Sequence, residues 1–138
     1  MSGNTGTQSL GVTIRVISSE NLTRKEKFKF IFKELRVAFC NGLLIGLLAF
    51  IFIGIYLQFM VHFEVNGFLI SGCIGLSLLI AMMIAGLDGT LIPMLFNKIG
   101  LDPAVASGPL ITTINDFVAV CTYYGVSIIL LVKVLGIG

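Results

Sequence analysis

Residues 100–124 read GLDPAVASGPLITTINDFVAVCTYY and place an acidic side chain, Asp116, inside an apolar run that continues to the C-terminus. A carboxylate near the middle of a bilayer costs about 2.5–3.5 kcal/mol on insertion scales, so it normally has a partner or a function. A helical period of 3.6 residues collects the small and polar side chains on one stripe: Gly108, Thr112, Asp116, Ala119, Tyr123 and Ser127. We expect this stripe to face protein or a water-filled cavity rather than lipid.

The composition is that of an integral membrane protein. Of the 138 residues, 57% are hydrophobic and 12% are charged, whereas soluble domains have roughly 25% charged residues. The net charge of +2 is too small to indicate nucleic-acid binding. The cysteines at 40, 73 and 121 lie in apolar runs without CxxC spacing, which is typical of small buried side chains rather than a disulfide or metal site.

The hydrophobic pattern predicts an all-α, polytopic membrane helix bundle with three full transmembrane helices and an N-terminal amphipathic or half-buried helical region. The predicted spans cover about 37–62, 67–96 and 109–133. We divide the chain into a segment at 1–36, which holds an N-terminal motif and a basic amphipathic stretch, and a transmembrane domain at 37–138.

Two alternatives stay open for each part of the N-terminal segment. Leu10, Ile14 and Ile17 share one helical face and favour a short half-buried helix, while the nearby glycines favour a disordered, surface-lying start. Six of the nine basic residues lie in 24–36, which is either an amphipathic helix in the headgroup layer or a loop. In both cases the positive charge places 24–36 in the cytoplasm and, after three spans, the C-terminus on the extracytoplasmic side of the inner cell membrane.

Small residues recur every four positions in the first two spans and predict ridges for close helix packing: Gly42, Gly46, Gly54, Gly67, Ser71 and Gly75. The second span is long, and Gly86, Gly89 and Pro93 mark where it should kink or extend into the interface. Asp88 lies inside this apolar span and either faces a water-filled cavity or makes a cap or salt bridge near the interface.

The loop before the last span carries a helix-start signal. Asp102 is suited to the N-cap position and Pro103 to the first helical position. Pro109 then interrupts the short helix or turn that they begin, so the last span should start near residue 109.

With these residues in view, the chain resembles the transmembrane part of the MgtE-type magnesium transporters. The most specific match is GLDPAVASGPLITTIND at 100–116, and GNTGTQS at 3–9 and KELRVAFCNGLLIG at 33–46 follow the order of the family. The first membrane helix of the family, most of its second and its cytoplasmic regulatory domains have no counterpart. The resemblance therefore implies a partial module, either a truncated chain or one piece of a split transporter.

The resemblance implies a bundle that forms a homodimer in the lipid bilayer, with hydrated Mg²⁺ as the transported ion on the two-fold axis and other divalent cations as further candidates. It assigns the ion site to Asp116, with Thr112 and Gly108 one and two turns before it, and it places Asp102 at the cytoplasmic mouth. Asp88 stands where the family has a small or apolar residue, which makes it a candidate secondary acidic site.

The implied function is divalent cation transport, not enzymatic catalysis. One alternative is a non-conducting fragment or assembly subunit of a larger transporter. A less favoured alternative is an intramembrane aspartyl protease, since Asp88 and Asp116 could form a carboxylate dyad. The sequence around Asp88 is GLDG, which does not match the GxGD motif of such proteases. Asp116 could also have a structural role and bond Thr or Tyr hydroxyls of a neighbouring helix.

Overall fold

A computed structural model of the chain describes residues 1–19, 23–61, 67–105, 108–134 and 136. These residues form four α-helices and no strand, which confirms the all-α prediction. The elements are α1 (Ser2–Ser19), α2 (Arg24–Tyr56), the π-helix η1 (Leu57–Val61), α3 (Gly67–Lys98), the 3-10 helix η2 (Pro103–Val105), α4 (Gly108–Ser127) and the π-helix η3 (Ile128–Val134).

Three helical segments are long and apolar enough to cross a membrane, which confirms the three predicted transmembrane helices. They cover Arg24–Met60, Gly67–Lys98 and Gly108–Leu130, with mean hydropathies of 2.4, 2.4 and 1.4. At 1.5 Å per residue the first is about 55 Å long, whereas a hydrocarbon core is about 30 Å thick. The first span must therefore extend well beyond the hydrocarbon.

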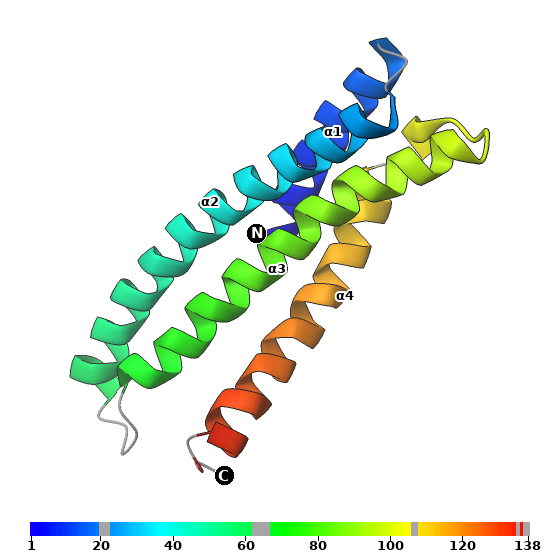
Figure 1. The fold of residues 1–138 in the computed structure, drawn as a ribbon. Helices are drawn as coiled ribbons and strands as arrows, with labels where there is room; N and C mark the ends of the chain where they lie inside the picture. Colours follow the sequence, from blue (N-terminus) through cyan, green and yellow to red (C-terminus); the bar gives the residue numbers. More distant parts are fainter. Residues whose placement is uncertain (20–22, 62–66, 106–107, 135, 137–138) are drawn as a thin grey trace.

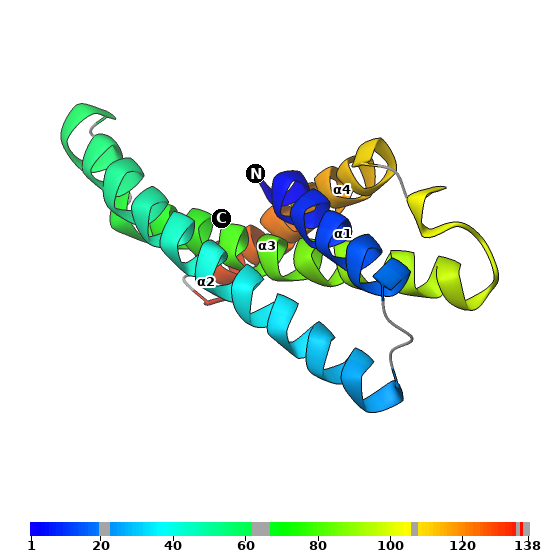
Figure 2. The same ribbon diagram turned by 90° about the horizontal axis from the view of Figure 1, so that it is seen from above.

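The helices form an up-and-down bundle with one short member (Figure 1). α2, α3 and α4 run antiparallel in turn, while α1 begins at mid-height and runs to the end where α2 begins. α1 packs against α3 and α4. Figure 2 shows that α1 lies beside α4 and that the first part of α2 diverges from α1.

α1 is helical from Ser2 to Ser19, which confirms the predicted N-terminal helical region, and the alternative of a disordered start is wrong. Its apolar side explains why: Leu10, 5% exposed, packs with Ile111 of α4, which is fully buried, in a core that includes Ile14 of α1. Ile92 and Phe96 of α3 complete this core. Burial of this face against two other helices provides the stability that the local sequence lacks.

The predicted small-residue ridges form the contact between α2 and α3. A Cβ placed on Gly46 would lie 2.7 Å from the carbonyl oxygen of Gly75, and a Cβ on Gly75 would lie 2.7 Å from that of Gly46. A Cβ on Gly42 would lie 3.1 Å from Cα of Leu79. The backbones therefore meet directly, which is the packing that small residues allow between apolar helices.

The basic stretch at 24–36 is helical, and the loop alternative is wrong. It is continuous with the span rather than a separate helix, because α2 runs from Arg24 to Tyr56. The Glu26 carboxylate accepts hydrogen bonds from the backbone N–H and the hydroxyl of Thr23, at 2.8 and 2.6 Å, and so fixes the amino end of α2. α3 likewise continues as one helix past Pro93 to Lys98, so the second span extends toward the basic end of the bundle.

Candidate functional site

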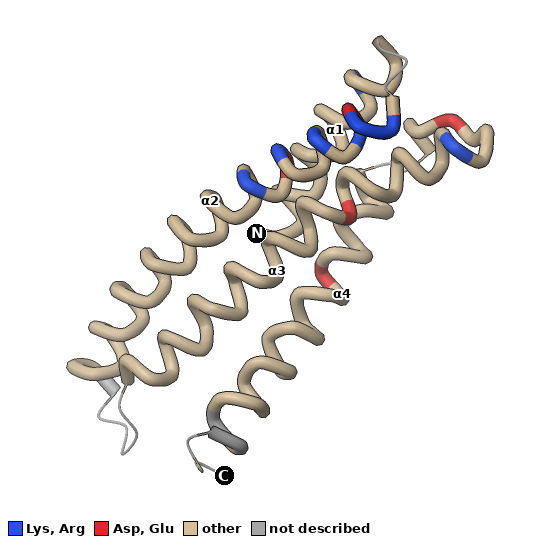
Figure 3. The backbone as a smooth tube through the Cα atoms, viewed as in Figure 1, with Lys and Arg blue, Asp and Glu red and all other residues tan. Residues whose placement is uncertain are grey.

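Charge is distributed unevenly along the bundle (Figure 3). The Lys and Arg residues drawn in blue gather at the end where α1 and α3 finish and α2 begins. Farther along the bundle, one acidic residue lies on α3 and one on α4. They are Asp88 and Asp116, the acids of those two helices. Both carboxylates therefore lie within helices that could span a membrane.

Asp116 lies in the third turn of α4, about 12 Å along the axis from Gly108. Its side chain is exposed in the single chain, and Thr112, one turn earlier, is half-buried. The start of α1 lies against this pair, because a Cβ placed on Gly3 would be 3.5 Å from Asp116 Oδ1 and 3.0 Å from Thr112 Cγ2. One turn farther back, a Cβ on Gly108 would meet Thr7 of α1 at 3.7 Å. Part of the predicted stripe therefore contacts α1.

The polar groups of Asp116 and Thr112 make no hydrogen bond or ion pair among the described residues. Other hydroxyls in the helices behave differently and donate to the carbonyl four residues earlier, at 2.6–2.9 Å: Thr13, Ser77, Thr90 and Thr113. Polar groups in folded proteins normally have a partner in protein or water. The carboxylate and hydroxyl on this side of α4 are therefore available to water or to a ligand.

Asp102 lies in the turn before η2 and is exposed. Its Oδ1 accepts a hydrogen bond from Ala104 N–H at 2.9 Å, and its carbonyl accepts one from Val105 N–H at 2.9 Å, which confirms the predicted helix-start role. The turn belongs to the basic end of the bundle (Figure 1). The first two turns of α4 separate it from Asp116, so the structure does not bring these two carboxylates together.

Asp88 is half-buried on α3. In the described part of the chain it makes no ion pair and no hydrogen bond, including none with Asp116. The carboxylate dyad that an aspartyl protease needs is therefore not formed by these two side chains in the single chain.

Asn115 is the residue that sequence reasoning missed. It is 1% exposed, and neither its Oδ1 nor its Nδ2 has a hydrogen-bond partner. A Cβ placed on Gly6 of α1 would overlap Asn115 Nδ2 and would lie 3.2 Å from the carbonyl oxygen of Ala85 in α3. The sequence did contain a signal for this role, because an Asn in an apolar span usually lies at a contact between helices. Asn115 thus fills the junction of α1, α3 and α4, and it is the residue before Asp116 on α4.

No group of three or more His, Cys, Asp or Glu side chains able to hold a metal ion is found among the described residues. Among the described residues of these four types, a cation at Asp116 would therefore find at most one further ligand. Of the ions common in proteins, Mg²⁺ is the one that typically keeps several waters and binds through one or two carboxylates.

In the described part of the chain, three potential transmembrane helices form the bundle and two of them carry an unpaired carboxylate, which defines a polytopic helical membrane protein. The chain belongs to the MgtE family, described as divalent cation transporters, whose match covers residues 1–126.

Three curated relatives bear the name magnesium transporter MgtE. The protein of Bacillus subtilis is 39% identical over 127 residues, covering 92% of this chain and 26% of the relative. That of Enterococcus faecalis is 38% identical over 125 residues, covering 91% and 26%. That of Thermus thermophilus is 33% identical over 130 residues, covering 94% and 27%. The resemblance noted in the sequence is confirmed, and the chain spans about a quarter of the length of these relatives.

Proposed function

We propose that this chain carries hydrated Mg²⁺ across a membrane, with Asp116 as the residue that holds the ion. The observation that carries the proposal is that the Asp116 carboxylate and the Thr112 hydroxyl lie one turn apart on α4. Neither group has a hydrogen-bond or ion-pair partner in the described part of the chain. Membership of a family of divalent cation transporters supports the same assignment.

The chemistry of the ion fits this sparse site. Mg²⁺ demands octahedral geometry at about 2.0–2.1 Å and gives up water reluctantly, so a protein holds it through few direct ligands. Asp116 supplies the charge, Thr112 bonds a water of the hydration shell, and Gly108 leaves room for that shell. Selectivity then arises from the size of the cavity and from outer-shell contacts rather than from removal of water.

The ion path lies between two copies of the chain. Ile111 and Asn115 are the buried residues of α4, so much of this helix is free to meet a second copy. In a two-fold dimer the two Asp116 carboxylates face each other, and their repulsion favours a dication between them. Asp102 attracts cations at the mouth of the path. The basic end lies in the cytoplasm and the end of α4 on the other side of the cell membrane.

A flux assay with matched variants tests the ion site. The chain is reconstituted in vesicles that contain a Mg²⁺-sensitive dye, and influx is measured after external Mg²⁺ is added. Asp116→Ala should abolish influx. Thr112→Val should weaken apparent ion affinity about fivefold, because it removes one hydrogen bond worth about 1 kcal/mol. Thr113→Val is the control and should leave flux unchanged, since the Thr113 hydroxyl donates to the Pro109 carbonyl at 2.9 Å.

A binding assay separates the ion site from conduction. Titration calorimetry of the purified chain with Mg²⁺, Ca²⁺ and Co²⁺ should detect binding that Asp116→Ala removes. Binding without flux would favour the alternative of a subunit that conducts only with further helices. Undiminished Mg²⁺ flux and binding in a folded Asp116→Ala variant would refute the proposed role of Asp116.

A further inference from the structure

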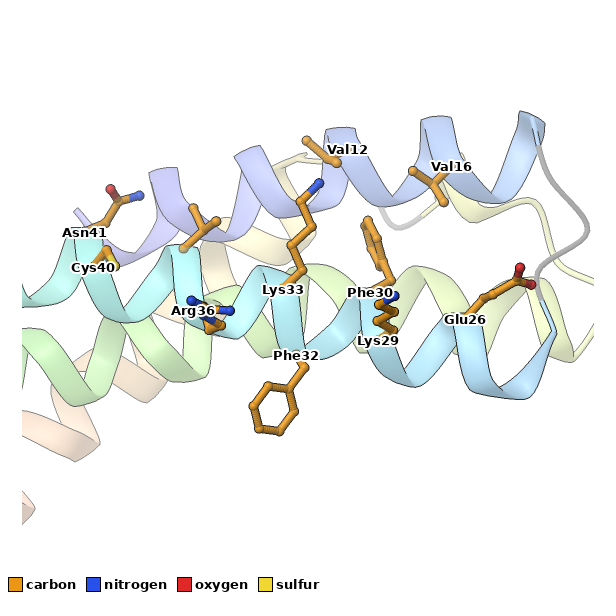
Figure 4. Close-up of a pocket in the computed structure, with 11 residues that line it drawn as sticks. Val12, Val16, Glu26, Lys29, Phe30, Phe32, Lys33, Arg36, Cys40 and Asn41 are labelled. Atoms are coloured by element: carbon orange, nitrogen blue, oxygen red, sulfur yellow. The ribbon is translucent and has the colours of Figure 1, made fainter.

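A groove of about 900 Å³ separates α1 from the first part of α2 at the basic end of the bundle. Figure 4 shows the two helices diverging there, with the Lys33 side chain reaching toward α1 beside Val12. This groove is distinct from the ion site, since α4 contributes none of the residues that line it.

The α2 wall of the groove carries three cations. Lys29, Lys33 and Arg36 are spaced by four and three residues and therefore lie on one face of the helix. Glu26 also lines the groove, but its Oε2 already accepts two hydrogen bonds from Thr23, at 2.8 and 2.6 Å. No ion pair to these three cations is found in the described ranges. The groove thus has an excess of positive charge that a ligand can neutralise.

Apart from the three cations, Glu26 and Asn41, the residues that line the groove are apolar. Val12 and Val16 of α1 face the cations from the opposite wall, and Val37 and Cys40 continue the α2 wall toward the apolar part of the span. The distance from Lys29 to Cys40 is about 16 Å along the helix axis. The groove therefore offers cations on its α2 wall, with an apolar surface opposite them on α1 and farther along α2.

We propose that this groove binds an anionic phospholipid, with the headgroup phosphate at Lys29, Lys33 and Arg36 and an acyl chain along Val12, Val16 and Val37. Basic residues next to a membrane span attract anionic lipids. A small soluble anion would leave the valine surface in contact with water, and an apolar protein helix would bury the cations without counter-charge. A lipid satisfies both parts of the groove. Phe32, which also lines the groove and is 61% exposed, suits the same interfacial position.

Native mass spectrometry of the purified chain in a neutral detergent tests the proposal. Dioleoylphosphatidylglycerol and dioleoylphosphatidylcholine are titrated separately, and bound lipids are counted. We expect dioleoylphosphatidylglycerol to bind at least tenfold more tightly than dioleoylphosphatidylcholine. The triple variant Lys29→Gln/Lys33→Gln/Arg36→Gln should lose that preference. Each cation removed should weaken the affinity for phosphatidylglycerol about fivefold.

The matched control removes the same charge from the same helix outside the groove: Arg24→Gln/Lys25→Gln/Lys27→Gln. It should retain the preference for phosphatidylglycerol. Equal losses in the two triple variants would mean that general surface charge attracts the lipid, and would overturn the proposal.

Two further arms test the apolar wall and the source of the phosphate. Val12→Trp fills the groove without a change of charge and should reduce phosphatidylglycerol binding about tenfold, because the indole ring takes the place of the acyl chain. Water-soluble glycerol 3-phosphate should not compete at millimolar concentration. Competition by glycerol 3-phosphate, or full binding in a folded Val12→Trp variant, would contradict a lipid site.

Discussion

Replacing Gly89 by alanine should force α1 away from α3. A Cβ on Gly89 would overlap the carbonyl oxygen of Gly6, and it would lie 3.0 Å from the carbonyl carbon and 3.1 Å from Cα of the same residue. All three are backbone atoms, so no rotation of a side chain can relieve the overlap. The helix α1 must move as a whole, together with its contacts to α4.

The size of the effect follows from two opposing terms. Overpacking of a close contact costs about 1–3 kcal/mol, whereas alanine is preferred to glycine within a helix by about 0.8–1.0 kcal/mol. Gly89→Ala should therefore lower the free energy of unfolding by up to about 2 kcal/mol. Gly72→Ala is the matched control on the same helix, because its nearest atom would be Phe50 Cε2 at 3.8 Å, an ordinary contact. This variant should be neutral or slightly more stable.

Reversible unfolding measures the difference. The protein is held in mild-detergent micelles, dodecyl sulfate is titrated in, and helical circular dichroism is followed at each step. The two variants should differ by about 1–3 kcal/mol, with Gly72→Ala the more stable. Equal stability would show that α1 does not approach α3 as closely as described, and the account of the three-helix junction would fail.

Three other predictions use the same assay. Asn115→Leu should raise the free energy of unfolding by about 1 kcal/mol, because it removes a buried amide without partners, and a loss instead would reveal a partner such as a bound water. Gly46→Ala and Gly75→Ala should each lower the free energy of unfolding. The double variant should lose less than the sum of the two, because either alanine alone already forces the same two backbones apart. Additive losses would contradict the direct contact of Gly46 with Gly75. The exchange Asn115→Asp/Asp116→Asn keeps the composition but buries an unpaired charge, so it should lower the free energy of unfolding by about 3–5 kcal/mol. Unchanged stability would disprove that residue 115 of α4 points into the bundle and residue 116 out of it.

The three spans could be predicted because the length of an apolar run is a local property of the sequence. The contact of Gly46 with Gly75 was also predictable, since small residues spaced by four form a ridge whatever helix lies opposite. The helicity of α1 was not decided by its own residues. Gly3 and Gly6 are unfavourable in an isolated helix, and their role is explained only by α4, whose Thr112 and Asn115 occupy the space beside them.

The candidate site was predictable in part for a related reason. An ionised carboxylate in an apolar span costs enough to stand out, so Asp116 was identified from the sequence. An amide costs less, and Asn115 did not stand out beside it. Its burial depends on which side of α4 meets α1 and α3, and that is a property of packing among three helices rather than of any local pattern.

The order of Asn115 and Asp116 links the fold to the site. Successive residues of a helix point about 100° apart, so one side chain of the pair enters the three-helix junction while the other stays on the open side of α4. A rotation of α4 by one residue would exchange them and bury the carboxylate, which is far more costly than burial of an amide. The glycines of α1 allow the contact that holds Asn115 in the junction. The same contact therefore fixes the direction of Asp116, so a change at Gly6 should alter the proposed ion binding, although a Cβ on Gly6 would meet Asn115 and not Asp116.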